Sequence, residues 1–397
     1  MNVIFYSKTF FMDCDLPLIE QLRAKGVNVK YLLEITPHSK KSTYLNIETL
    51  YPKAGIFKAD IYKEELSTIQ KILDWENTFI INRVSSKVFA ISNIKVSIKL
   101  LYFLLKQKFE ILHSTVFFDL NEWPIYSFRK KMLLTVHDPF PHTGELTKRK
   151  SLNRWIGMKL VKFFLILNKA QKQQFMDIHK LQPSQVYSSK LGVYSSLKLY
   201  LKETNKQPSK EYILFFGRIS PYKGIELLLK AMLKVHESYP HINLIIAGSG
   251  KFNFDIGKYA TLNYVDIRNR FIPTEELAAL INASKFVVCP YTDATQSGVI
   301  MSCYALNKPV IASDVGGLSE MVKHRETGLL VTPSDVNKLT QAIIELLSND
   351  NLLNEFSQNI RNQYEKGLDS WSVISSEIIS AYTKIANKSL NTNSNSI

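Results

Sequence analysis

At 397 residues the chain is longer than the size at which one hydrophobic core keeps growing, so we expect two domains of roughly 200 residues each. Hydrophobic residues make up 45% of the chain and aromatic residues 11%, which excludes a largely disordered protein. The net charge is +15, and residues 1–200 carry 30 basic against 16 acidic side chains, a net of +14. The N-terminal half is therefore predicted to meet an anionic partner: nucleic acid, an anionic membrane surface or a phosphorylated substrate.

The three cysteines, Cys14, Cys289 and Cys303, lie far apart without a C-x-x-C pair, which argues against a disulfide framework or a zinc site. We predict no bound metal and no cofactor. The first residues lack a basic segment and carry Asp13 and Asp15 too early for a secretory signal. No run approaches the roughly 18 apolar residues that span a bilayer. We therefore expect a cytoplasmic protein, either soluble or peripheral on the inner face of the cytoplasmic membrane.

Short apolar runs alternate with helix-like periods along the chain, which indicates βα units and parallel sheets. The first strand is predicted at 2–7, followed by a helix that begins near Asp15 and ends at Gly26. Further strands are predicted in this half at 27–35, 110–115, 131–138 and 162–168. Residues 1–200 are predicted to form a Rossmann-like N-terminal domain.

A polar stretch at 202–211 predicts the linker to a second α/β domain, residues 201–370. Its strands and helices are predicted at 212–217, 224–238, 242–248, 285–290, from about 298, and at 309–313. Terminal helices are predicted at 338–350 and 373–386. The helix at about 371–390 is predicted to pack back on the N-terminal domain, and residues 391–397 to form a disordered tail.

The turn FFGRISPYKG, residues 215–224, follows a predicted strand and contains Gly217, Arg218 and Lys223. In parallel sheets ligands bind beyond the carboxyl ends of the strands. Two cations five residues apart across a turn can both reach one diphosphate. A surface turn with two solvated charges is the alternative.

The loop CPYTDATQSGVIMSCYAL, residues 289–306, ends a predicted strand and starts a helix near Gly298. Thr295, Gln296 and Ser297 would present backbone amides and hydroxyls at the N-terminus of that helix, which forms an anion site. The alternative is ordinary capping of the helix by Ser297.

His137, in the stretch TVHD, follows another predicted strand and would face whatever the C-terminal half binds. The alternative is a structural histidine that satisfies buried partners. The stretch GSGK at 248–251 lacks the spacing of a phosphate-binding P-loop, so we exclude that motif. Gly248 and Gly250 would allow close backbone packing near a ligand or form a plain turn.

In this order and spacing, TVHD, FFGRISPYKG, LIIAGSG, FVVCPY, SGVIMSCYALNKPVIASDVGGLSEMV and ETGLLV resemble family 4 of the retaining glycosyltransferases. That family has the GT-B architecture, an α/β fold of two Rossmann-like doubly wound domains facing a central cleft. The resemblance is strong from Tyr212 to Val331, looser from Leu133 to Gly192, and thin before that. It implies a metal-independent, hexosyltransferase-type enzyme that moves a sugar from a nucleoside-diphosphate-sugar to an acceptor hydroxyl with retention.

The resemblance also implies roles for single residues. Arg218 and Lys223 match the pair that holds the donor diphosphate, and His137 matches the histidine beside the donor sugar. The stretch 265–273 resembles the loop that holds the nucleobase, and the donor-binding residues in it are taken as Arg268 and Phe271.

The sequence departs from the family in two places. The family's two glutamates, separated by seven residues, fall on Ala294 and Ser302, and its Gly-rich loop after the first strand is replaced by SKTFFMDCDLP at 7–17. The T-Q-S-G turn resembles a branch of the family that carries it at this place. The predicted donor contacts are therefore Asp293, Thr295, Gln296, Ser297, Gly298 and Ser302.

The basic half suggests a further partner. Residues 148–169 mix Lys and Arg with apolar side chains, and residues 95–109 are a second candidate with the same pattern. This pattern fits peripheral contact with an anionic bilayer that carries a lipid-linked acceptor. Buried elements with solvated basic edges are the alternative. The expected partners are a nucleotide-sugar donor and a saccharide or lipid-linked acceptor, in the synthesis of a bacterial surface polysaccharide or glycolipid.

Two other functions are weighed against transfer. The losses at Ala294 and Ser302 suggest a GT-B protein that binds a sugar nucleotide without transferring it. A pI near 9.4 suggests nucleic-acid binding, but the sequence offers no recognised RNA or DNA module, so we expect no nucleic-acid partner.

Overall fold

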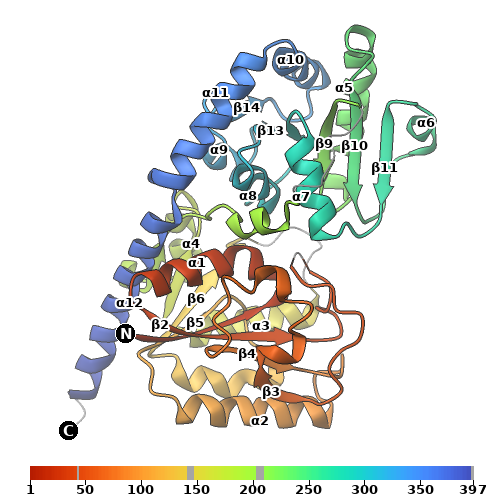
Figure 1. Ribbon diagram of the computed structural model, residues 1–397. Coiled ribbons are helices and arrows are strands. Elements are labelled where there is room, and N and C mark those ends of the chain that lie inside the picture. The colour runs from red at the N-terminus through yellow and green to blue at the C-terminus, as the bar shows by residue number, and fades with distance from the viewer. Residues whose placement is uncertain (43, 141–146, 203–209, 395–397) are drawn as a thin grey trace. The chain divides into compact units, whose positions relative to one another are not determined.

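The computed structural model describes residues 1–42, 44–140, 147–202 and 210–394. The chain forms two compact units, each an α/β domain on its own sheet (Figure 1). The N-terminal unit comprises residues 1–192 together with the chain from Trp371 onward, and the C-terminal unit comprises residues 193–370.

The N-terminal unit contains an eight-stranded sheet in the order β3-β4-β2-β1-β5-β6-β7-β8. All neighbours pair in parallel except β3 with β4, which pair antiparallel. The strands are β1 (Asn2–Lys8), β2 (Asn28–Ile35), β3 (Gly55–Lys58), β4 (Thr78–Asn82), β5 (Ile111–Ser114), β6 (Met132–Val136), β7 (Phe163–Ile166) and β8 (Val186–Ser188). Because both faces of the sheet are covered, its central strands are continuous buried apolar runs rather than alternating ones.

Alternation along β1 divides the core of this unit into two layers. Ile4 and Tyr6 pack in one cluster with α2 (Ile91–Lys106) and the 3₁₀ helix η4 (Leu120–Phe128), and α3 (Lys148–Leu160) packs against the same cluster. Phe5 points the other way, toward the face covered by α1 (Met12–Ala24) and α12 (Trp371–Ser394). Figure 1 shows α1 and α2 on opposite sides of the sheet. The remaining helix, α4 (Gln171–His179), follows β7.

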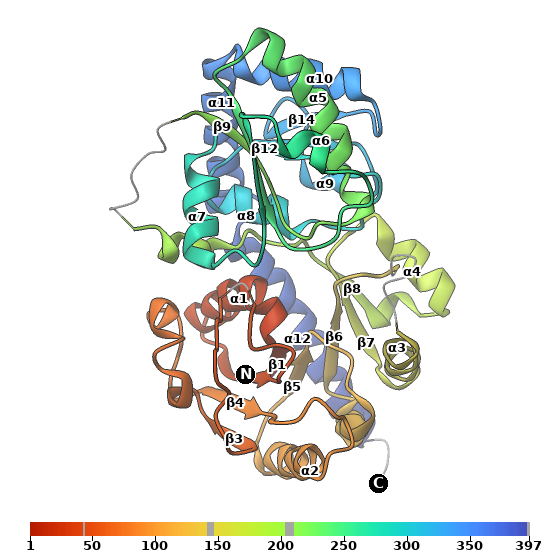
Figure 2. The ribbon, with the colours of Figure 1, turned by 90° about the vertical axis from the view of Figure 1, so that its right-hand side faces the viewer.

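The C-terminal unit contains a six-stranded parallel sheet in the order β11-β10-β9-β12-β13-β14. The strands are β9 (Tyr212–Phe216), β10 (Asn243–Gly248), β11 (Val265–Asn269), β12 (Val287–Cys289), β13 (Val310–Ser313) and β14 (Gly328–Val331). The helices are α5 (Ile225–Ser238), α6 (Gly257–Ala260), α7 (Thr274–Ala283), α8 (Gly298–Ala305), α9 (Leu318–Met321), α10 (Val336–Leu347) and α11 (Asp350–Arg361), several of which are labelled in Figure 2. The carboxyl ends of all six strands lie at one edge, where the ligand-type turns of the sequence are found.

The boundary between the two units lies earlier in the sequence than the polar stretch at 202–211 suggests. The 3₁₀ helix η6 (Ser195–Tyr200) packs on α7 and α8, so the boundary lies at 192/193 rather than 200/201. Most of the predicted linker, residues 203–209, lies outside the described residues. Helix α12 belongs to the N-terminal unit, and it continues to Ser394, into the stretch predicted as a disordered tail; residues 395–397 lie outside the described part.

Across the described parts of the chain, no helix is long and apolar enough to cross a membrane. The same residues contain no cluster of three or more His, Cys, Asp or Glu side chains placed to hold a metal ion.

Candidate functional site

The turn after β9 holds Lys223 in a buried position. Gly224 has a φ of +65°, and a Cβ there would lie 1.9 Å from the carbonyl oxygen of Pro290, so only glycine lets the turn pack against the end of β12. The Lys223 side chain is 8% exposed, and its Nζ lies 3.6 Å from the centre of the Tyr291 ring. Arg218, in the same turn, is exposed. Lys223 is thus a cation seated on an aromatic face rather than a solvated surface charge.

The ends of β9 and β10 continue to pair beyond the strands themselves. A Cβ at Gly248 would lie 1.8 Å from the Gly217 carbonyl oxygen, and one at Gly250 would lie 2.0 Å from that of Ile219. The amide of Ile219 donates to the Ser249 carbonyl at 3.0 Å. The two glycines therefore serve close backbone packing, which fixes the path of the chain at Arg218.

The loop after β12 brings the T-Q-S-G turn to the N-terminus of α8. Thr295 and Ser297 are buried, at 7% and 3% exposure, and Gln296 is half-buried. Ser297 stands at the N-cap position, but its side chain makes no capping hydrogen bond; its hydroxyl lies beside that of Tyr291. The side-chain capping alternative is therefore wrong, and the Ser297 side chain does not satisfy the amide groups of the first turn of α8.

Ser302 and Ala294, at the positions where the resembled family carries glutamates, make hydrogen bonds within the C-terminal unit. The Ser302 hydroxyl donates to the carbonyl of Gly298 at 2.9 Å, within its own helix. Ala294 is 4% exposed, and its carbonyl accepts a hydrogen bond from the Gly317 amide at 3.1 Å. Asp293, next to Ala294, is exposed. The structure therefore leaves Ser302 only its acceptor capacity toward a ligand.

Gly316, in the loop after β13, packs closely against the loop after β12. We expect its replacement by alanine to displace both loops. Its φ is +49°, and a Cβ would lie 1.8 Å from the Ala294 carbonyl oxygen, a backbone atom that cannot move without its loop. We expect Gly316→Ala to lower the free energy of unfolding by about 2 kcal/mol, measured by calorimetry.

Gly26→Ala is the matched control, since Gly26 also has a positive φ, +80°, but nothing within 4 Å of the added Cβ. It should lower the free energy of unfolding by roughly 1 kcal/mol. Equal effects of the two substitutions would show that the contact with Ala294 is unimportant.

The predicted nucleobase loop lies at the edge of the same sheet. The Arg268 guanidinium pairs with Asp266 at 2.8 Å and Glu276 at 3.1 Å, and Arg270 pairs with Glu276 at 2.6 Å. Phe271 is 40% exposed beyond the end of β11. Strands β9 and β12 are neighbours, so Arg218, Lys223 and residues 295–298 come together, whereas β11 lies two strands away from β9. We call the group of Arg218, Lys223 and residues 295–298 the cationic edge.

His137, in the N-terminal unit, follows β6 and stacks on the Phe11 ring, with centroids 4.1 Å apart and planes 13° apart. Burial lowers the pKa of His137 well below its ordinary value, although the Asp138 charge opposes the shift, so the imidazole is neutral at pH 7. A neighbouring histidine, His113, is structural: it is buried between the hydroxyls of Tyr382 and Thr135, both at 2.6 Å.

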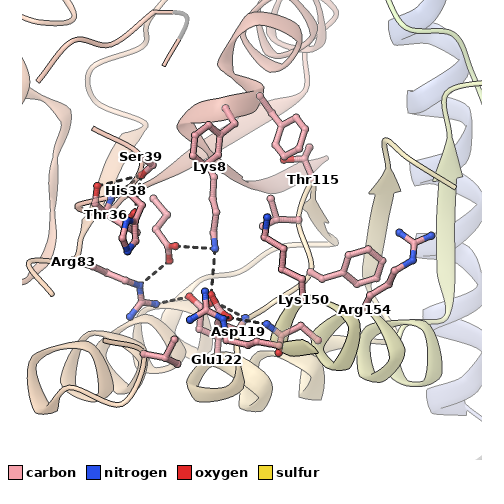
Figure 3. Close-up of a pocket in the computed structure, with 18 of the residues that line it drawn as sticks. Lys8, Thr36, His38, Ser39, Arg83, Thr115, Asp119, Glu122, Lys150 and Arg154 are labelled. Atoms are coloured by element: carbon pink, nitrogen blue, oxygen red, sulfur yellow. Dashed lines mark hydrogen bonds and ion pairs between the residues drawn. The ribbon is translucent and has the colours of Figure 1, made fainter. Parts of the chain in front are cut away.

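A cavity of about 630 Å³ opens beside His137 at the carboxyl edge of the N-terminal sheet (Figure 3). We call it the Lys8 pocket. It is lined from the ends of five strands and from α3, by residues that include Lys8, Thr36, Arg83, Thr115, His137 and Lys150. This is the edge at which an open parallel sheet binds its ligand.

Three buried charged side chains, Glu34, Arg83 and Glu122, form a network with the half-buried Lys8 on the wall of this pocket (Figure 3). Glu34 receives Lys8 at 3.1 Å and the Arg83 Nε at 2.8 Å, and a second Arg83 nitrogen pairs with Glu122. Although burial opposes it, Lys8 and Arg83 hold the pKa of Glu34 well below its usual range. Burial and the charge of Glu34 raise the pKa of Glu122. The network therefore holds Lys8 and Arg83 against the firmly ionised Glu34 and the readily protonated Glu122, and Lys8 also pairs with Asp119 at 3.7 Å.

Several polar atoms of the pocket residues are left without a hydrogen-bond partner among the described residues. They are the side-chain carbonyl oxygens of three asparagines and one ring nitrogen, on Asn93, Asn121, Asn153 and His137. A buried amide oxygen needs a donor, so this pocket suits a ligand that brings hydroxyl groups.

Sequence reasoning identified His137 but not the other walls of this pocket. Lys8 ends β1 and Arg83 follows β4, positions that mark the carboxyl edge once the strands are known. Phe11 occupies the place of the absent Gly-rich loop, and its role as the stacking partner of His137 comes from the tertiary fold alone.

Two α/β units, each built on a largely parallel sheet, define the GT-B fold, and solved structures of that fold align with nearly the whole chain. Sucrose-phosphate synthase from Thermosynechococcus elongatus matches 97% of this chain and 99% of its own, with a TM-score of 0.65 and 20% identity. HepE from Anabaena in complex with UDP-glucose matches 99% of this chain and 100% of its own, with a TM-score of 0.60 and 14% identity.

One family model matches most of the C-terminal unit. Residues 198–363 match the family described as "Glycosyl transferases group 1". An uncharacterised glycosyltransferase of Methanocaldococcus jannaschii is 29% identical over 187 residues, which cover 45% of this chain and 46% of the relative. The chain spans less than half the length of the first curated relatives that it matches.

Proposed function

We propose that the chain is a retaining glycosyltransferase that moves a hexose from a nucleoside-diphosphate-sugar to an acceptor hydroxyl. The observation that carries this proposal is Lys223, buried on the Tyr291 ring at the same sheet edge as the N-terminus of α8. Such a cation and a helix N-terminus together neutralise a diphosphate. The UDP-glucose held by the structural neighbour HepE is a ligand of this kind.

In the proposed reaction the bond from the anomeric carbon to the diphosphate oxygen breaks, and the bond from the acceptor oxygen forms on the same face. The acceptor proton passes to the departing phosphate. Arg218, Lys223 and the first amides of α8 stabilise the charge that develops on the leaving diphosphate, the role that a metal ion has in other designs. His137, neutral at pH 7, hydrogen-bonds a sugar hydroxyl without adding charge.

The Lys8 pocket is the proposed site for sugar hydroxyls on the acceptor side. Its unpartnered amide oxygens accept from hydroxyls, and the cations of α3 line the same cavity. We propose a saccharide or lipid-linked acceptor, in the synthesis of a bacterial surface polysaccharide or glycolipid.

Nucleoside diphosphates should stabilise the C-terminal unit. At a ligand concentration about 100 times Kd, binding to the native state adds about 2.7 kcal/mol, which raises Tm by roughly 5 to 10 °C. The measurement is differential scanning calorimetry with UDP, GDP, ADP and their sugars, because all four tryptophans (Trp75, Trp123, Trp155 and Trp371) lie in the N-terminal unit and would not report on this one.

Lys223→Ala should remove most of this shift, whereas Lys230→Ala, on the surface of α5, should keep it. A full panel of nucleotides that leaves Tm unchanged would contradict the proposal.

A second candidate is a GT-B protein that binds a sugar nucleotide without transferring it. The burial of Ala294 and Ser302 favours this candidate, since neither residue offers a carboxylate to a donor. Nucleotide-dependent stabilisation without release of sugar to any acceptor pool or to water would support this candidate over transfer.

A further inference from the structure

Helix α2 exposes an apolar stripe along the side turned away from the sheet. Its inner side, with Val96, Leu100 and Leu104, is buried in the core. The outer side repeats apolar residues at helical spacing, and their exposed fractions are 73% for Ile91, 38% for Ile94, 63% for Ile98, 58% for Tyr102 and 64% for Leu105. Single exposed apolar residues are common on protein surfaces, but a continuous stripe along one helix marks an interaction surface.

The segment that carries this stripe has charges of a single sign. Residues 83–109 contain six Lys or Arg and no Asp or Glu, and Lys95, Lys99 and Lys106 of α2 are exposed next to the stripe. Residues 146–176 contain eight Lys or Arg and no Asp or Glu. This second segment includes α3, on which Leu152 and Trp155 are 43% and 60% exposed. Both helices pack against η4 on one side of the sheet, and we call their outer surface the α2–α3 face.

A groove of about 300 Å³ lies between β3 and α2, beside the stripe. Its apolar lining includes Ile56, Phe57, Tyr102 and Phe103, and Lys99 and Lys106 also line it. The Lys106 Nζ lies 4.3 Å from the centre of the Tyr102 ring. Ammonium groups beside aromatic rings match the boundary of a bilayer, where phosphate lies next to hydrocarbon.

We propose that the α2–α3 face docks on an anionic lipid bilayer. Apolar side chains enter the headgroup region, and the lysines on either side bind lipid phosphates. Nucleic acid would use the cations but not the apolar stripe, which favours a bilayer as the occupant. The 148–169 segment alone does not form this face, because Phe163–Ile166 is the buried strand β7. The proposal does not depend on glycosyl transfer, since docking requires no donor.

The test is flotation of the full chain with vesicles of phosphatidylcholine alone or mixed in equal parts with phosphatidylglycerol. We expect flotation only with the mixed vesicles. The double substitution Lys95→Gln with Lys99→Gln should lower the partition coefficient roughly 10-fold to 30-fold. The double substitution Ile98→Glu with Leu105→Glu should lower it at least roughly 10-fold, since each loses a buried apolar side chain and adds a repelled charge.

Matched controls carry the same changes elsewhere. Lys230→Gln with Lys234→Gln removes two exposed lysines from α5, and Ile178→Glu alters a side chain of α4 that is 57% exposed. Both should float like the unaltered chain. Equal flotation on neutral and anionic vesicles, or unchanged flotation of the two α2 variants, would overturn the proposal. So would a chain that does not float and instead sediments as a dimer dissociated by the Ile98→Glu change, which would make the face a contact between copies.

Discussion

Replacing Lys223 or Arg218 by alanine is expected to lower kcat/KM for the nucleotide-sugar by roughly 10²-fold to 10³-fold, or about 2 to 4 kcal/mol of barrier. The physical reason is that charge develops on the leaving diphosphate, and each substitution removes one cation from the edge that meets it. Lys223 should show the larger loss because it is held, almost fully buried, on the Tyr291 ring, whereas Arg218 is exposed. The measurement is steady-state transfer or donor hydrolysis with each variant.

The separation of kcat from KM distinguishes two roles. A cation that acts on the leaving group lowers kcat, whereas one that only binds the donor raises KM. Lys230→Ala serves as the control for loss of a lysine in the same unit. Near-normal kcat/KM in both Lys223→Ala and Arg218→Ala would contradict the proposal that the cationic edge stabilises the leaving diphosphate.

Replacing Arg83 by leucine is expected to destabilise the N-terminal unit by roughly 3 to 5 kcal/mol. Arg83 is 5% exposed and holds Glu34 and Glu122 through separate nitrogens. Its loss takes this cation from both buried carboxyl groups and leaves Glu34 with Lys8 and the Tyr6 hydroxyl. The measurement is urea unfolding followed by tryptophan fluorescence, which reports on this unit because all four tryptophans lie in it.

The size of this effect should depend on pH, and the sign follows from Glu122. Its pKa is raised in the folded chain by burial and by Glu34, so its protonated form stabilises the fold at low pH and that contribution is lost as pH rises through the folded pKa. Without Arg83 the pKa of Glu122 should rise further, which makes Arg83→Leu least harmful in acid. Arg129→Leu, at an exposed position, should stay within about 0.5 kcal/mol. Equal stability of the two variants at neutral pH would show that the network is not a structural requirement.

The elements and turns of the C-terminal unit could be predicted from the sequence because each is indicated by a short, local stretch of residues. The turns after β9, β10 and β12 directly follow short apolar strands, and Gly224, Gly248 and Gly250 mark where backbones approach closely. Parallel pairing then brings the turns of β9 and β12 to one edge without further information. The fold class and the neighbourhood of Arg218, Lys223 and Ser297 follow from that pattern.

The N-terminal site could not be predicted in the same way because its partners are distant in sequence. Glu34, Arg83 and Glu122 come from segments that are dozens of residues apart and meet only once the strand order is known. Likewise, the Ser302 hydroxyl looked available for a ligand, yet a serine in a helix can return its hydrogen bond to the carbonyl four residues earlier, as it does here to Gly298. The position of the boundary at 192/193 depends on η6 packing on α7 and α8, which polar composition does not reveal.

The contribution of α12 to the N-terminal unit has a consequence for biosynthesis. The C-terminal unit is one continuous segment, 193–370. The N-terminal sheet, in contrast, is covered on one face by α12, which leaves the ribosome only after that segment. Until then His113 lacks the Tyr382 hydroxyl, and the sheet face that carries Phe5 is only partly covered. The second unit can therefore complete its fold first, and the nascent chain carries an incompletely covered N-terminal sheet while the whole C-terminal unit is synthesised.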